Sequence, residues 1–176
     1  MRRSPGLTLV ELLIAIGIVA VLISLGTPLL RGLLLDARMT AAVNALVHVV
    51  HLARQEAQKD LRDVVICRSI DATQCASPGN WSSGWIAFVN RDRDDPPLVD
   101  AGEPVLHAVQ SQPLRSITSN RRSYVLRPYA LRATNGTIVF CDDRGVAGAR
   151  AVIVSYTGRP RTATRTASGG ALSCPV

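Results

Sequence analysis

Three arginines near the end of the chain stand among small and hydroxylated residues, in a pattern that suits phosphate binding. Arg159, Arg161 and Arg165 lie within the segment 157–166, TGRPRTATRT. Guanidinium groups and threonine hydroxyls donate hydrogen bonds to phosphate oxygens, and such a segment can lie flexibly along a nucleic-acid backbone. A solvated basic strand and tail would carry the same pattern, so the segment has two interpretations.

The charge of the chain is concentrated in the same region. The 176 residues have a formal net charge of +7, and nineteen of the twenty basic residues are arginines. Residues 111–176 contain ten arginines and two aspartates, a net +8, whereas residues 36–110 have a net charge of −3. A positive region attracts polyanions, which makes Arg150 and Arg144 secondary candidates for DNA contact. No recognition helix is evident, so we expect contacts to the phosphates of double-stranded DNA rather than base-specific readout.

Other chemistry has little support in the sequence. The three histidines are scattered, and neither a nucleophile elbow nor a phosphate-binding loop is present, so we predict no catalytic residues, no cofactor and no enzyme activity. The segment 90–95, NRDRDD, alternates oxygen-bearing side chains as some calcium loops do. Its arginines compete for the carboxylates, and the glycine and distal glutamate of a calcium loop are missing. We therefore predict an exposed acidic turn and no metal site.

Four cysteines lie in the second part of the chain, at Cys67, Cys75, Cys141 and Cys174. Their even number, the short spacing of the first two and the near-terminal position of the last indicate disulfides formed in an oxidising compartment. A zinc site is the alternative, but the chain has no CxxC motif and its histidines are far from the cysteines in sequence. We predict the pairs Cys67–Cys75 and Cys141–Cys174.

The N-terminal region combines a basic stub, MRRSPG, with an apolar run. Residues 12–30 carry no charge, and as a helix they would be about 28 Å long, close to the ~30 Å of a bilayer core. The arginines of the stub predict that it stays cytoplasmic and that the rest of the chain lies outside. A secretory signal has its cleavage site after the apolar run, whereas the candidate site here precedes it. Glu11 begins the span, where a carboxylate is costly unless it has a partner.

Residues 6–14, GLTLVELLI, resemble the cleavage and methylation signal of type IV prepilins and type II secretion pseudopilins. The resemblance implies that a prepilin peptidase cuts after Gly6 and that the new N-terminal Leu7 is methylated. Glu11 falls five residues after the cut, as in that family, and Pro28 matches a proline where the helix unwinds in assembled filaments. In a filament, the buried Glu11 carboxylate can pair with the amine of a neighbouring Leu7. A plain signal anchor with an incidental glutamate is the alternative.

Motifs farther along resemble the head of FimT- and GspH-type minor pilins. They are Cys67, Cys75 and Trp81 followed by GWIAF at 84–88, then FCD at 140–142, and YTGRPR at 156–161. In the FimT branch, a Gly-Arg-x-Arg element near the C-terminus is associated with DNA capture during natural transformation. Gly158, Arg159 and Arg161 match that element, and Arg165 extends it.

Two functions follow from this resemblance. The first is a minor type IV pilin that binds extracellular DNA non-specifically and assists its uptake. The second is a GspH-type pseudopilin, a structural tip component of a type II secretion system that contacts proteins only. Either implies other pilins, the prepilin peptidase and the inner membrane as partners. The expected location is a single-pass inner-membrane precursor with a periplasmic head, and then a filament at the cell surface.

A long helix and short strands must position these residues. Apolar residues at positions 39, 43, 46, 50, 53 and 57 recur at three- and four-residue intervals, which predicts an amphipathic helix able to cover a sheet. Six segments rich in β-branched or aromatic residues follow, at 64–68, 85–89, 105–109, 123–126, 137–141 and 151–156. We expect an α+β fold of the type IV pilin kind: a long N-terminal helix, bent at Pro28, packed on a small two-sheet β head.

The domain boundaries follow from these elements. We predict a leader peptide at 1–6, a transmembrane and filament-core helix at 7–30, and its amphipathic continuation at 31–60. An extracellular β-rich head with a basic C-terminal region then occupies 61–176.

Overall fold

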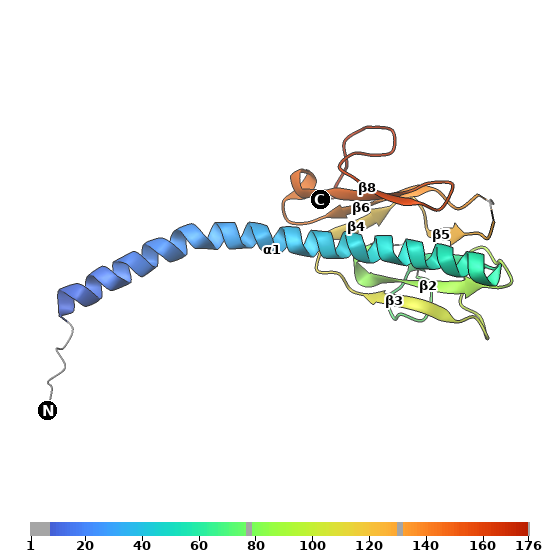
Figure 1. The fold of residues 1–176 in the computed structure, drawn as a ribbon, viewed down its shortest axis with the longest axis horizontal. Helices are drawn as coiled ribbons and strands as arrows, with labels where there is room; N and C mark the ends of the chain where they lie inside the picture. Colours follow the sequence, from blue (N-terminus) through green and yellow to red (C-terminus); the bar gives the residue numbers. More distant parts are fainter. Residues whose placement is uncertain (1–7, 77–78, 130–131, 176) are drawn as a thin grey trace, which may run out of the picture. The chain divides into compact units, whose positions relative to one another are not determined.

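The computed structural model describes residues 8–76, 79–129 and 132–175 of the chain. The chain divides into two compact units, Met1–Ala37 and Arg38–Val176. A single long helix, α1 (Leu9–Asp60), begins in the first unit and ends in the second, and two antiparallel four-stranded sheets follow it (Figure 1).

The strands are short, and the chain changes sheet three times, before β4, before β5 and before β6. The first sheet has the order β3-β2-β1-β5 and is made of β1 (Asp63–Arg68), β2 (Gly84–Asn90), β3 (Val105–Gln110) and β5 (Ser123–Leu126). The second has the order β4-β6-β7-β8 and is made of β4 (Ser116–Ser119), β6 (Gly136–Cys141), β7 (Arg150–Val154) and β8 (Pro160–Ala163). Short 3-10 helices, Trp81–Ser83 and Gly145–Gly148, precede β2 and β7. The expected α+β fold with a long helix and two sheets is confirmed.

The first unit is an apolar helix with exposed side chains. Over Leu9–Ser24 the only charged residue is Glu11, and Leu9, Leu13 and Leu22 are 75%, 61% and 63% exposed. The helical backbone continues without a break through Pro28. So large an exposed apolar surface needs lipid or neighbouring helices around it. Among the described residues, the stretch Leu30–Asp60 is long and apolar enough to cross a membrane by length and composition, and a third of its most apolar window is buried.

In the second unit, α1 supplies one continuous apolar stripe to the core. All six positions of the predicted stripe are buried, and Ala42 and Val49 widen it. The polar residues of the opposite face, Asn44, His48 and His51 among them, are exposed. One cluster joins this stripe to side chains from both sheets, including Trp85 of β2 and Phe140 of β6. In Figure 1 this part of α1 lies between β2 and β3 of the first sheet and β6 and β8 of the second.

Two strands were not expected from the sequence, and one of them changes the interpretation of the arginine segment. β4 is a short polar strand, and β8 contains Arg161 within the segment that was expected to be flexible. Proline and charged residues disfavour a central strand, but β8 lies at the sheet edge, where only one side must pair. The backbone of β8 is therefore fixed by its ladder with β7.

Both predicted disulfides are confirmed. Cys67 is joined to Cys75 across a sequence separation of 8 residues, and Cys141 to Cys174 across 33 residues. Each lies in a small cluster separate from the main core: Cys67 with Phe88 and Ile86, and Cys141 with Ala151 and Leu172. The second disulfide ties the C-terminal segment to strand β6.

We expect the longer disulfide loop to contribute more to stability. The chain-entropy relation gives about 2.5 kcal/mol for a loop of the shorter length and about 3.7 kcal/mol for the longer one. Urea unfolding followed by the fluorescence of Trp81 and Trp85, both buried, measures the loss in Cys67→Ser/Cys75→Ser and Cys141→Ser/Cys174→Ser double variants. A larger loss in the first variant would show that loop length does not govern the effect.

Candidate nucleic-acid interface

Gly158 shapes the turn between β7 and β8 from which the arginines extend. The Gly158 N–H donates to the Ser155 carbonyl at 2.9 Å, and the Ser155 N–H donates to the Arg159 carbonyl at 3.0 Å. Gly158 has a φ of +68°, a conformation that favours glycine. A Cβ at this position would lie 2.8 Å from Leu126 Cδ1. The glycine of the Gly-Arg-x-Arg element is therefore required by the turn and its packing.

The register of β8 decides the face from which Arg161 projects. Arg161 lies opposite Ile153, and Thr162 lies opposite Val152. Val152 packs in the helix-side core, so Arg161 projects from the sheet face that is turned away from α1. Arg150 lies opposite Phe140, another residue of the helix-side core, and therefore belongs to the other face. A ligand that lies flat on one face of this sheet contacts only one of these two arginines.

The three principal arginines are exposed and lie along one hairpin. We call residues 155–165 the arginine hairpin; within it Arg159, Arg161 and Arg165 are all exposed. The backbone of Arg165 forms an isolated antiparallel β-bridge with Ala171, and its side-chain Nη1 donates to the Gly169 carbonyl at 3.2 Å. Among the described residues, no carboxylate forms an ion pair with any of the three. Their charges are thus available to an external anion.

Arg144, in contrast, is held by a carboxylate. Its Nη2 lies 2.7 Å from Asp142 Oδ2, and its Nε donates to the same carboxylate at 3.1 Å. Burial opposes ionisation of Asp142, but the hydrogen bonds and charge of Arg144 outweigh that effect and lower the pKa of Asp142. The sequence placed Arg144 among the five candidate DNA contacts. Because its guanidinium already pairs with Asp142, Arg144 is the least available of the five to an external phosphate.

A groove opens beside the turn of the arginine hairpin. We call it the tyrosine groove; its volume is about 400 Å³, and no acidic residue is among the residues described as lining it. Its basic and aromatic lining residues are Arg54, Arg127, Arg132, Arg159, Tyr129 and Tyr156. The Arg132 guanidinium lies over the Tyr156 ring, 5.6 Å from its centroid. The sequence predicted a ligand contact at Arg159. It did not predict the other groove residues, because most of them lie far from Arg159 in the chain.

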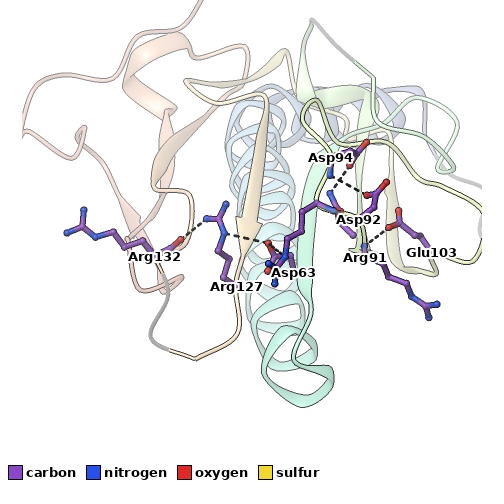
Figure 2. Close-up of polar contacts among 9 residues, drawn as sticks. Asp63, Arg91, Asp92, Asp94, Glu103, Arg127 and Arg132 are labelled. Carbon is purple, nitrogen blue, oxygen red and sulfur yellow. Dashed lines mark hydrogen bonds and ion pairs between the residues drawn. The ribbon is translucent and has the colours of Figure 1, made fainter.

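A buried carboxylate orients Arg127 at the edge of this groove. Arg127 Nε lies 3.5 Å from Asp63 Oδ2, and its Nη1 donates to the Arg132 carbonyl at 2.7 Å (Figure 2). The Asp63 side chain is only 5% exposed and also pairs with Arg93 Nε at 3.6 Å. Figure 2 shows the Arg132 side chain extending away from this network. Arg127 is therefore fixed, while the guanidinium of Arg132 is directed elsewhere.

The acidic turn lies between β2 and β3, close to Asp63. Carboxylate oxygens of Asp92, Asp94 and Asp100 lie within 4.8 Å of one another. Partial desolvation and the charges of Asp92, Glu103 and Asp94 raise the pKa of Asp100. Glu103 accepts a short hydrogen bond from the Arg91 N–H (Figure 2). Exposed acidic turns are common without a metal, and the expectation of no metal site stays a prediction.

At the N-terminus, the structure gives Glu11 a role that the sequence analysis overlooked. Gly6 and Leu7 lie outside the described residues. Glu11 Oε2 accepts from the Thr8 N–H at 3.5 Å, and Thr8 Oγ1 accepts from the Glu11 N–H at 3.3 Å. This reciprocal arrangement is a capping box at the start of α1. The spacing of a threonine three residues before a glutamate is visible in the sequence and could have revealed it.

Comparisons with known proteins agree with this architecture. The family described as type II transport protein GspH matches residues 42–158, and the prokaryotic N-terminal methylation motif matches residues 1–27. A crystal structure of the type IV minor pilin FimU from Pseudomonas aeruginosa PAO1 has a TM-score of 0.53 and 18% identity, covering 77% of this chain and 99% of FimU. A second crystal form has a TM-score of 0.52 and 18% identity, covering 78% and 95%. No curated protein matches the chain significantly.

A methylation motif on an apolar helix, followed by a two-sheet head, defines a structural pilin-like protein. The chain belongs to the GspH family, and it shares its fold with the minor pilin FimU. This confirms the family expected from the motifs. Membership implies a processed, membrane-anchored precursor and association with other pilins. The GspH match ends at residue 158, so Arg159, Arg161 and Arg165 lie beyond the region that defines the family.

The pair Asp142–Arg144 predicts a specific dependence of stability on pH. Because the pKa of Asp142 is lower in the folded state, its ion pair stabilises the head above the ordinary carboxyl pKa and is lost as the pH falls below about 4. Asp142→Asn should lower the free energy of unfolding at pH 7 by about 1–3 kcal/mol, and by less at pH 3. Urea unfolding at both pH values measures this, with Asp95→Asn, an exposed aspartate, as the control. An equal loss at both pH values would contradict the assignment.

Proposed function

We propose that this GspH-family pilin binds extracellular DNA non-specifically through Arg159, Arg161 and Arg165, and that it assists DNA uptake in natural transformation. The observation that carries the proposal is the arginine hairpin: three exposed arginines on an ordered turn and strand, with no carboxylate paired to them among the described residues. The net charge of +8 over residues 111–176 adds a field that attracts polyanions. Arg150 is a secondary contact and Arg144 the least available one.

The hairpin offers a way to bind phosphates at low entropic cost. The ladder with β7 fixes the backbone of residues 160–163 before any ligand arrives, so only side chains must be ordered on binding. Guanidinium groups bind phosphate oxygens with two hydrogen bonds, and such phosphate contacts carry no sequence information. Affinity of one head should be in the micromolar range or weaker. Several heads along a filament would raise it through avidity.

A second candidate is a pseudopilin of a type II secretion system that contacts proteins only. The description of the matching family, a type II transport protein, favours it. In that case the arginine hairpin would bind acidic surfaces of neighbouring subunits or remain solvated. DNA binding by the full chain separates the two candidates.

For assembly, we infer processing between Gly6 and Leu7 by the prepilin peptidase, methylation of Leu7, and a head that faces the periplasm before filament assembly. Glu11 contacts Thr8 through long hydrogen bonds of 3.3 and 3.5 Å. The amine of a neighbouring Leu7 is a stronger, charged partner for this carboxylate inside a filament.

Replacing the three arginines by glutamine should remove most DNA binding. Three phosphate contacts predict that log affinity falls with log salt concentration with a slope of about −2.7, at ~0.9 per contact. The triple variant should bind weakly and with a flatter slope. Fluorescence anisotropy of a labelled duplex, titrated with the full chain in detergent micelles at several salt concentrations, measures both quantities.

The matched control is Arg91→Gln/Arg93→Gln, which removes two exposed arginines from the acidic turn. Its effect should be small because Asp92 and Asp94 repel phosphate and Arg93 already pairs with Asp63. If the triple variant binds the duplex as well as the parent at matched salt, the hairpin is a solvated surface and the secretion pseudopilin becomes the better assignment.

Mass spectrometry of the protein from its native membrane should find a methylated N-terminus at Leu7. Glu11→Ala should leave membrane insertion intact and reduce recovery of the protein in sheared surface filaments, because the Leu7 amine loses its partner. Glu56→Ala, which removes a carboxylate from the exposed pair with Lys59 on the same helix, is the control. An intact Met1 terminus in cells with the peptidase would exclude processing at this site.

A further inference from the structure

We propose that the tyrosine groove binds unpaired nucleobases, so that this head prefers single-stranded DNA whose phosphates lie on the arginine hairpin. The inference rests on the proposed function and deepens it, because it names the form of DNA that is bound. Single-strand binding sites combine a positively charged groove along the backbone with aromatic side chains on which the bases stack. Both components occur together here.

The distribution of aromatic side chains is the first observation. The chain has only seven aromatic residues, and all of them are among the residues described. Five are buried in the head, whereas Tyr129 is 72% exposed and Tyr156 is 56% exposed. Both exposed rings line the same groove, although 27 positions separate them in the sequence. The fold therefore brings the two exposed rings of the head to one groove.

The backbone and neighbours of these rings are the second observation. Tyr129 has a φ of 58°, in the left-handed region that is unfavourable for an aromatic residue and is found more often at functional positions. Tyr156 is held by Arg132, whose guanidinium lies 5.6 Å from the ring centroid. The Arg132 carbonyl in turn accepts a hydrogen bond from Arg127, which pairs with Asp63 (Figure 2). Tyr156 is therefore held in place before a ligand arrives.

The charge and continuity of the groove are the third observation. Arg54, Arg127, Arg132 and Arg159 line it, and Arg159 is shared with the arginine hairpin. A volume of about 400 Å³ lies in the range of small-ligand cavities and accommodates a nucleotide. Because Arg159 belongs to both surfaces, a strand whose phosphate contacts Arg159 can place an adjacent base in the groove that Tyr156 lines. An acidic peptide would use the same arginines but would gain little from two exposed rings, so the rings favour nucleic acid.

The test compares single-stranded and double-stranded ligands on the full chain in detergent micelles. The probes are a fluorescent 12-mer of thymidine and a duplex of the same length. Tyr129→Leu/Tyr156→Leu should weaken binding of the 12-mer at least about fivefold, the lower bound expected for the loss of one stacked base. It should change duplex affinity less than twofold. Tyr129→Phe/Tyr156→Phe should bind like the parent, because phenylalanine preserves the stacking surface, and Val146→Ala is a control for an exposed apolar side chain outside the groove.

A photochemical measurement on the unmodified protein keeps the test independent of folding. A 12-mer that carries 5-iodouracil should cross-link on irradiation to Tyr129 or Tyr156, as located by peptide mass spectrometry. Cross-links confined to residues outside the groove would overturn the proposal, and so would equal binding of the 12-mer by the leucine variant. Displacement of the 12-mer by a polyglutamate peptide, with no effect of the tyrosine changes, would assign the groove to acidic protein segments. If the parent binds neither ligand, the proposed function itself fails.

Discussion

The head depends on one shared surface, the apolar stripe that α1 presents to both sheets. Each sheet has four short strands, and neither has a second layer of its own large enough to bury its inner face. Met39, Leu46 and Ala57 mark a stripe that reaches along the helix from its entry into the head to its last turn. Trp85 and Phe140 pack from the two sheets into the same cluster. Loss of contact with the helix would therefore expose the inner faces of both sheets at once.

The outer faces of the two sheets, unlike the inner faces, do not pack on α1. Each carries a small cluster built around a disulfide, Cys67–Cys75 on one sheet and Cys141–Cys174 on the other. These clusters are too small to order long surface segments by burial alone, and the covalent links supply the constraint. One consequence concerns function: the segment that follows β8 returns to β6 through Cys174, which confines the hairpin at both ends.

The basic region and the acidic turn show how the same residue types acquire different roles. Arg144, Arg93 and Arg127 each face a carboxylate, so their charges are largely used within the head. Arg159 and Arg161 face none among the described residues, and their charge is directed outward. A count of arginines along the chain treats these groups alike, whereas their surroundings separate positioning residues from candidate ligand contacts.

The family, the long helix and its buried face, six of the eight strands and the cysteine framework could all be predicted from the order of amino acids alone. These features depend on local signals: the spacing of Glu11 after Gly6, the recurrence of apolar residues on one helix face, and β-branched runs between turns. The sequence also pointed to Arg159 and Arg161, because they follow a glycine in a short motif. Only the tertiary structure showed that this segment is an edge strand, since its pairing partner lies in β7 and its own proline and arginines disfavour a strand. Folding also brings Tyr129 and Tyr156 to one groove beside Arg54. Contacts between residues 27 to more than 100 positions apart arise from the packing of sheets on a helix, and they leave no periodic pattern in the sequence from which they could be predicted.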